Sequence, residues 1–341
     1  MFTLTSLEMA NQENISVFEF SKDDYNFTSK PWNGETMELS KLNVKRATER
    51  RDPQNILYLN QPFDPKQFNF TKIKSGEILF RLQENCDNGK TTEKNGVRND
   101  KVKENKQSKD LIIINVSPLE FGHVLAVPDV DSLIAQKLSE YCVRLSLQMM
   151  LLSNHRDIKI IVKLDFMLDL TVYVHYRQLI ISMYMQYYLE HELYVESCPV
   201  RHISGPLYEL DTMPTKGFAF QLHGMSLEEL TNLLFKVTNY FQESEIAHNF
   251  FMTKGTVFGE EKMSDKRTVR VYVWPRKKYI GIKDEAAFNV ATVELAGHLP
   301  IKITDQYHSL TVESIENTLR GAALDEAEYQ AITDKVIQLC S

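Results

Sequence analysis

Short apolar runs rich in β-branched residues recur along the chain, and they limit its fold more than any other feature. Residues 111–116 read Leu-Ile-Ile-Ile-Asn-Val, and residues 122–128 form a second run that ends at a proline. Runs of this length and composition predict buried strands. The same reasoning predicts further strands at residues 77–82, 159–170, 179–194, 269–274, 291–295 and 301–303.

Helical patterns lie between these predicted strands. A Ser-x-x-Glu capping box at residues 226–229 opens a helix predicted over residues 227–240. Apolar residues at near-helical spacing predict another helix over residues 132–152, and two short helices are predicted after Thr311 and Asp325. Strands and helices in this mixed order predict an α+β fold with a mostly antiparallel sheet flanked by helices.

Two segments differ in composition from the rest of the chain. Residues 84–110 contain almost no large apolar side chain. Such a segment buries too little surface to offset the entropy of ordering it, so a disordered insertion is predicted there. Residues 1–55 carry polar runs without clear periodicity and are predicted to form a partly irregular N-terminal extension. Residues 56–341 are predicted to form one domain around the insertion.

Charge and cysteine content narrow the classes of function. The chain has a net charge of -7, whereas a general nucleic-acid binder carries an excess of positive charge. No apolar run is long enough to span a membrane, and the N-terminal residues lack the basic start and apolar core of a secretory signal. The four cysteines form no Cys-x-x-Cys pair, which predicts free thiols in a reducing compartment, either the cytoplasm or the nucleus.

Four segments resemble one family, in that family's own order along the chain. They are QPFDPKQFNFTKIKSGEILFRL at residues 61–82, INVSPLEFGHVLAVPDV at 114–130, YYLEHELYVE at 187–196 and VYVWPRKKYIGIKDEAAFNVATVELAGHL at 271–299. The chain therefore resembles the GDP-hexose phosphorylases, the GDP-D-glucose and GDP-L-galactose phosphorylases of the histidine-triad superfamily. The resemblance implies a histidine-triad-like sheet with two related halves. It also implies transfer of GMP from a GDP-sugar to a histidine and then to phosphate, with GDP and a hexose 1-phosphate as products.

In the family that the chain resembles, the nucleophile is the middle histidine of a His-φ-His-φ-His strand, where φ is an apolar residue. That strand directly precedes the Tyr-Tyr-Leu segment, which here is residues 187–189. Anchoring on this segment places the three histidine positions at Ile181, Met183 and Met185. A preceding turn with glycine, asparagine and serine lines the family's nucleotide site and is not recognisable in residues 168–179. The chain thus resembles a divergent member that lacks the triad.

The side chains at the triad positions differ from imidazole in their chemistry. Histidine is nucleophilic when neutral and can carry a proton near pH 7. Isoleucine has no lone pair, and the methionine thioether has no titratable proton. The three side chains lie on one face of the predicted strand and are interpreted as part of the hydrophobic core. No glycine occurs between His123 and Ser204, although phosphate-binding loops need glycine for close backbone approach.

These losses predict a catalytically inactive relative with no catalytic residue, no cofactor and no metal. Its predicted role is a scaffold for an unidentified protein partner. Two alternatives stay open: an active GDP-D-glucose phosphorylase, which is a guanylyltransferase, and a sensor that binds GDP or a GDP-sugar. Resemblance of fold does not decide between them.

Several single residues are candidates for a functional site. The resemblance places His123 on the site-forming strand, as either a hydrogen-bonded structural histidine or a retained contact to a nucleotide phosphate. His191, Cys198 and His202 cluster in sequence as a conceivable Cys–His nucleophile or zinc site. They lack a third orienting group for the first chemistry and paired ligand spacing for the second, so neither is favoured.

Two further patterns lie towards the C-terminal end. The Trp-Pro-Arg-Lys-Lys segment at residues 274–278 places positive charge beside an aromatic ring. It is interpreted as a solvated strand end, with contact to an anionic ligand as the alternative. Gly297 is predicted to allow a close approach of two backbone segments.

Overall fold

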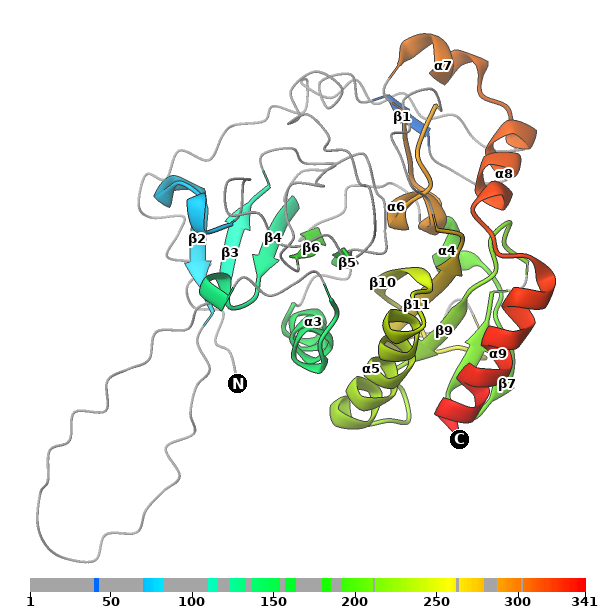
Figure 1. Ribbon diagram of the computed structural model, residues 1–341, viewed down its shortest axis with the longest axis horizontal. Helices are drawn as coiled ribbons and strands as arrows, with labels where there is room; N and C mark the ends of the chain where they lie inside the picture. Colours follow the sequence, from blue (N-terminus) through cyan, green and yellow to red (C-terminus); the bar gives the residue numbers. More distant parts are fainter. Residues whose placement is uncertain are drawn as a thin grey trace, which may run out of the picture.

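A ten-stranded sheet forms the centre of the computed structural model (Figure 1). The structure describes residues 40–42, 70–82, 110–115, 123–132, 137–153, 157–163, 180–184, 192–210, 212–261, 264–278, 287–301 and 303–341. The strand order is β2-β3-β4-β6-β5-β10-β11-β9-β8-β7. All neighbouring strands in this sheet are antiparallel.

The strand order divides the sheet into two halves that follow one another in the sequence. The first half contains β2 (Ile78–Arg81), β3 (Leu111–Ile114), β4 (His123–Val127), β5 (Lys159–Lys163) and β6 (Ile180–Tyr184). The second half contains β7 (Arg201–Ser204), β8 (Leu207–Glu209), β9 (Phe218–Gln221), β10 (Ala247–Thr256) and β11 (Arg267–Arg276). Among the described strands, the pairing of β5 with β10 joins the two halves. A separate parallel pair consists of β1 (Ser40–Leu42) and β12 (Leu299–Ile301).

Helices cover both faces of the sheet. One face packs against α3 (Glu140–Leu152), α5 (Leu227–Glu243) and α9 (Glu326–Cys340). The other face packs against α4 (Tyr194–Ser197), α6 (Thr292–Ala296), α7 (Thr304–Ser309) and α8 (Val312–Gly321). Short 3-10 turns lie at Phe70–Lys72, Ser75–Glu77 and Val130–Ser132.

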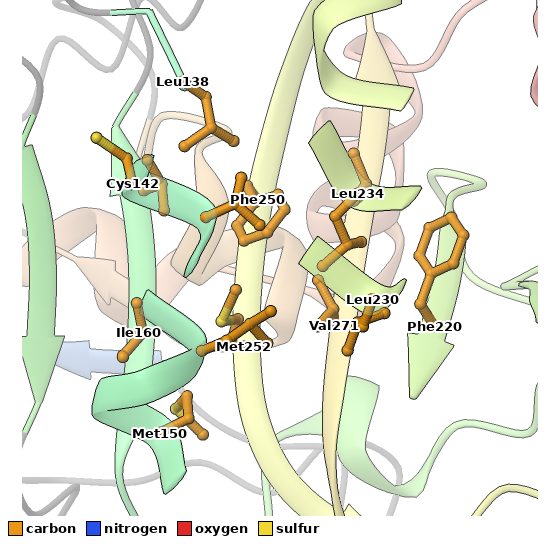
Figure 2. Packing of buried hydrophobic residues seen from close by; sticks show 14 of the residues in the cluster. Leu138, Cys142, Met150, Ile160, Phe220, Leu230, Leu234, Phe250, Met252 and Val271 are labelled. Atoms are coloured by element: carbon orange, nitrogen blue, oxygen red, sulfur yellow. The ribbon is translucent and has the colours of Figure 1, made fainter. Parts of the chain in front are cut away.

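The core under α3 and α5 is drawn in Figure 2. Cys142 and Met150 of α3 and Leu234 of α5 pack with Phe250 and Met252 of β10. All five side chains are fully buried. Burying one such side chain stabilises the fold by about 1.5–3 kcal/mol, so this cluster fixes the two helices on the sheet.

The predicted fold class is confirmed in its architecture: the chain is α+β, with an antiparallel sheet flanked by helices. The capping box at Ser226 opens α5 as predicted. The Ser226 hydroxyl accepts a hydrogen bond from the backbone N–H of Glu229, and the Glu229 carboxylate accepts one from the backbone N–H of Ser226. The helices predicted after Thr311 and Asp325 are α8 and α9.

Several predicted element boundaries need correction. The helix predicted from residue 132 starts at Glu140, because the side chain of Ser139 caps it by accepting from the backbone of Cys142. The strand predicted over residues 179–194 ends its described part at Tyr184, and Tyr194 itself begins α4.

The segment predicted as a strand at residues 291–295 is the helix α6. At its start, a Glu294 carboxylate oxygen accepts from the backbone N–H of Ala291 at 3.0 Å. At its end, Gly297 takes a left-handed conformation with φ +104°. These local end signals outweigh the β-branched composition of the segment.

The predicted domain limits fall largely on residues that the structure does not describe. Most of the extension 1–55 and residues 84–109 of the insertion lie outside the described residues. Asp110, at the end of the insertion, is buried and accepts hydrogen bonds from the backbone of Asp129 and the hydroxyl of Tyr141. The predicted extension and disordered insertion therefore stay predictions.

Candidate functional site

Polar side chains form a row across the centre of the sheet, at matching register positions of neighbouring strands. Position 184 of β6 pairs with His123 of β4 on one side and with Lys159 of β5 on the other. The Lys159 Nζ donates to Thr253 Oγ1 of β10 at 2.8 Å. Thr253 pairs with Arg270 of β11, which pairs with Gln221 of β9. We name these five residues the polar row: His123, Lys159, Thr253, Arg270 and Gln221.

The polar row lies on the sheet face opposite α3 and α5. Ile160, Met252 and Val271 stand next to members of the row along their strands and belong to the core under those helices. Successive residues of a strand point to opposite faces, so the row faces the side covered by α4, α6 and α8. All members of the row are buried, and buried polar groups are costly unless they find partners.

Glu196 of α4 supplies the counter-charge for Lys159. The Lys159 ammonium forms an ion pair with the Glu196 carboxylate, and the Thr253 hydroxyl donates to the same oxygen. The backbone N–H of Leu193 donates to the second carboxylate oxygen at 2.8 Å. The two charged side chains are 7% and 8% exposed, so each depends on the other for charge neutralisation. This contact ties α4 to β5 and β10.

Arg270 is held by backbone carbonyls and an aromatic ring. Its Nε donates to the carbonyl of Thr256 at 2.6 Å, and its Nη1 donates to the carbonyl of Glu196 at 2.9 Å. The guanidinium carbon lies 4.6 Å from the ring centroid of Phe258, a cation–π distance. A Cβ at Gly255 would lie 2.6 Å from the Arg270 Nε, so glycine leaves the space for this side chain.

His123, the imidazole of the polar row, contacts Asn115. The Asn115 Nδ2 lies 3.0 Å from Nε2 and 3.2 Å from Nδ1 of the ring. Because the amide nitrogen donates, the ring accepts through a lone pair. Both residues are buried. The geometry agrees with a hydrogen-bonded histidine, and a contact of His123 with a nucleotide phosphate stays a prediction.

The polar row combines two cations, a hydroxyl, an amide and an imidazole. Glu196 balances the charge of Lys159, and Arg270 uses its donors on backbone carbonyls, so these two residues position the surrounding elements. The imidazole of His123 is the group of the row with the chemistry of a nucleophile or general base. Position 184 separates His123 from the cations.

The triad positions on β6 lie on the opposite face from the polar row. Ile181 and Met183 are 0% and 4% exposed and pack in the core with Val124, Ile160 and the residues of α3. Their predicted burial as core filling is confirmed. Met185 lies outside the described residues.

The cysteine and histidine cluster predicted near residue 200 does not form a shared site in the described chain. Cys198 is buried with its thiol 3.1 Å from Thr212 Oγ1, whereas the exposed His202 contacts the carbonyl of Gly205 at 2.9 Å. His191 lies outside the described residues. Within the part of the chain that the structure describes, no group of three acidic, histidine or cysteine side chains could hold a metal.

Residues 274–278 are predicted to form a solvated strand end, and this prediction is wrong for residues 274–276. Trp274 and Arg276 are buried, and the Arg276 Nε donates to Asn249 Oδ1 at 2.7 Å. Its last two residues match the prediction, because Lys277 and Lys278 are both exposed, and Lys278 pairs with Glu245 at 3.1 Å. Residues 267–276 pair with β10 along their whole length, which draws the arginine into the sheet.

Sequence reasoning did not find Lys159, Thr253, Arg270 or Glu196. Lys159 and Arg270 stand inside predicted strands of apolar, β-branched residues. A charged residue is rarely buried without a partner, so a charge within such a run is the signal that could have identified them. The partners themselves come from distant segments and need the fold.

The chain is an α+β protein built from two sequential halves, with ten antiparallel strands, helices on both faces of the sheet and a central polar row. The chain belongs to the GDPGP1-like family. Residues 8–165 match the family model described as "GDPGP1-like, N-terminal domain", and residues 191–341 match "GDPGP1-like, C-terminal domain". The membership predicted from sequence resemblance is confirmed.

The chain is similar over most of its length to characterised relatives. It is 36% identical over 306 residues to GDP-D-glucose phosphorylase 1 of Bos taurus, which covers 88% of this chain and 74% of the relative. It is 33% identical over 331 residues to GDP-D-glucose phosphorylase 1 of Danio rerio, which covers 96% and 88%. Among solved structures, yeast Ap4A phosphorylase Apa2 in complex with Ap4A aligns with a TM-score of 0.49 and 11% identity, over 75% of this chain and 80% of that chain.

The predicted function as an inactive scaffold is contradicted by these relatives. They carry the names of phosphorylases, and none of these similarities points to a scaffold. The prediction rested on the triad positions, the unrecognisable turn before them and the absence of glycine between His123 and Ser204, whereas the relatives match the chain over most of its length. The predicted protein partner and the predicted lack of general nucleic-acid binding stay predictions.

Proposed function

We propose that this protein is a GDP-D-glucose phosphorylase. The observation that carries the proposal is 33–36% identity to proteins named for that activity, over 88–96% of the chain. In this reaction an oxygen of inorganic phosphate forms a bond to the α-phosphorus of GDP-D-glucose. The bond from that phosphorus to the bridging oxygen breaks, and the products are GDP and D-glucose 1-phosphate.

The polar row supports the proposal through its charge. Arg270 and Lys159 lie on one sheet face with His123, and because Glu196 neutralises Lys159, these groups together carry one net positive charge. Fixed positive groups in a buried setting favour anionic ligands and the negative charge that develops during phosphoryl transfer. A GDP-sugar and inorganic phosphate are both anionic ligands of this kind.

A cytoplasmic location is part of the proposal. The described cysteines Cys142, Cys198 and Cys340 are free thiols, as expected in a reducing compartment. Among the described residues, no helix is long and apolar enough to cross a membrane.

The test is an assay of the protein purified from cells that express its own gene. We expect phosphate-dependent release of GDP and D-glucose 1-phosphate from GDP-D-glucose, within about tenfold of the typical enzyme median of ~10 per second. Omission of phosphate is the matched control and should stop the release. Binding of GDP-D-glucose without turnover would overturn the proposal in favour of a GDP-sugar sensor.

A further inference from the structure

The segment that contradicts the family is short and sharply bounded. The two family models match residues 8–165 and 191–341, so residues 166–190 lie between the two matches. Within this segment, β6 still takes a central place in the sheet, paired with β4 and β5. This strand therefore lies at the centre of the sheet, between two segments that match the family, without the side chains that the resemblance implies for it. Because the segment has such abrupt limits, its difference from the family is expected to originate in its coding sequence.

The codons for this segment can be read in the neighbouring frame, in which each triplet joins the last base of one codon to the first two bases of the next. The codons of Ile181, Met183 and Met185 all begin with AU. In the neighbouring frame each of them therefore yields a triplet of the form xAU. When x is C, xAU is a histidine codon, so histidine is admitted at all three triad positions.

The spacer positions between these triplets are fixed more tightly. The Met183 codon ends in G and the Tyr184 codon begins with UA, so the neighbouring frame must read GUA, which is valine. The last base of the Ile181 codon joins UC of a UCN codon for Ser182 and gives phenylalanine, leucine or isoleucine. The neighbouring frame thus has the pattern His-φ-His-Val-His, with both spacers apolar.

The neighbouring frame also admits the turn that precedes the triad. Leu168 and Asp169 share a triplet xGA, which is glycine when x is G. The triplet shared by Leu170 and Thr171 is xAC, and that shared by Thr171 and Val172 is xGU. They read asparagine and serine when x is A. Glycine, asparagine and serine thus appear in the order of the family's turn, and glycine returns to a stretch that otherwise has none.

From this coincidence, and resting on the proposed function, we infer that the gene carries the histidine triad in the reading frame next to the one that gives residues 168–186. The enzyme's nucleophile strand is then translated from that frame. The frame changes after residue 165, where the family match ends, and changes back before Tyr187, where the resemblance resumes. The restored strand places histidines at positions 181, 183 and 185.

The sheet accommodates this strand by a one-residue slip. At present the odd positions Ile181 and Met183 face α3, because they are the apolar ones. In the neighbouring frame the apolar residues fall at even positions, so burying them under α3 requires β6 to shift by one residue, which moves every side chain to the other face. The histidines then face the polar row. One of them takes the place of position 184, between His123 and Lys159.

The decisive test is the nucleotide sequence of the gene and its transcript over codons 165–187. The inference requires the codons of Ile180, Ser182 and Tyr184 all to end in C, and those of Leu170 and Thr171 to end in A. A U at the end of the Tyr184 codon is enough to overturn it, because the third histidine then becomes tyrosine. This outcome says nothing about phosphorolysis, so the inference and the proposed function fail separately.

A second measurement reads the protein itself. Trypsin should release residues 164–177 from a chain with the present sequence, because it cleaves after Lys163 and after Arg177. In a digest of the native protein we expect that peptide to be absent, while the control peptide of residues 217–236 is abundant. Detection of both peptides at similar levels would overturn the inference, whatever the phosphorolysis assay gives.

Discussion

Lys159 shows what a buried charge requires in this sheet. Its ammonium lies between the Glu196 carboxylate and the Thr253 hydroxyl, away from water. Removing one partner of such a pair leaves the other buried and unpaired, which is usually worse than replacing both. The residue therefore matters to the fold through its partner more than through its own contacts.

We expect Lys159→Met to lower the free energy of unfolding by about 3–5 kcal/mol, because it leaves the Glu196 carboxylate without a cation. The double variant with Glu196→Gln should recover part of this loss. Urea unfolding of these two variants and of the single variant Glu196→Gln gives the coupling. Lys266→Met is the matched control, since Lys266 is 63% exposed and pairs with Glu260 at the surface, and it should cost at most about 1 kcal/mol. Additive losses at Lys159 and Glu196 would contradict the pairing.

Single residues were also the scale at which sequence reasoning was least complete. His123 was identified because it stands in a motif of the family. Lys159, Arg270 and Glu196 were missed because their roles depend on contacts between segments more than 30 residues apart, such as Lys159 with Glu196 at a separation of 37. A sequence shows a charge in an apolar run, but it does not show which distant residue neutralises that charge.

At the scale of elements, Gly297 joins two helices on the face that carries the polar row. It ends α6, and a Cβ at this position would lie 2.6 Å from the Cβ and 2.9 Å from the backbone nitrogen of Tyr194. Tyr194 begins α4, the helix that carries Glu196. The close approach predicted for Gly297 is confirmed, and it sets the position of Glu196 relative to the sheet.

We expect Gly297→Ala to destabilise the protein through two separate causes. The left-handed backbone costs about 1–2 kcal/mol for an L-residue, and the clash with α4 adds a further ~1–3 kcal/mol. Gly224→Ala is the control for the first cause alone, because Gly224 has φ +82° and nothing within 4 Å of a Cβ. Equal shifts of the urea midpoint for the two variants would show that α4 does not press on Gly297.

Elements with strong local signals were predicted well, and those shaped by tertiary contacts were not. The capping box before α5 and the caps of α8 and α9 lie within single segments, so their positions follow from the sequence. Residues 291–295 were predicted as a strand from their composition, yet Glu294 and Gly297 define a helix. Here end signals and the packing of α6 on β10 and α4 override a weak preference.

At the scale of the whole molecule, one buried histidine links stability to pH. Burial lowers the pKa of His248 to about 4, the Ile246 carbonyl at 2.9 Å opposes that shift, and the positive charge of Arg276 adds to it. The ordinary pKa of a histidine side chain is 6.5. Between pH 6.5 and 4, His248 is therefore protonated in the unfolded chain and neutral in the folded protein. Stability is therefore complete above pH 6.5 and falls as the pH drops towards 4.

We expect His248 alone to remove on the order of 3 kcal/mol of unfolding free energy between pH 7 and pH 4. His248→Asn keeps an N–H for the Ile246 carbonyl but does not titrate, so this part of the pH dependence should disappear. His223→Asn, at an exposed position, is the control and should leave the dependence unchanged. Urea unfolding at pH 4.5, 5.5 and 7 measures the slopes, and identical slopes for the wild type and His248→Asn would exclude this histidine as the cause.

The pairing of β5 with β10, which joins the two halves of the sheet, determines when the polar row forms during synthesis. His123 and Lys159 belong to the half that leaves the ribosome first, whereas Thr253, Arg270 and Gln221 belong to the half that follows. Neither half holds the complete polar row, so during synthesis the row exists only after the second half has docked. Any ligand that contacts residues of both halves therefore stabilises their docked state, and this stabilisation rises with the ligand concentration.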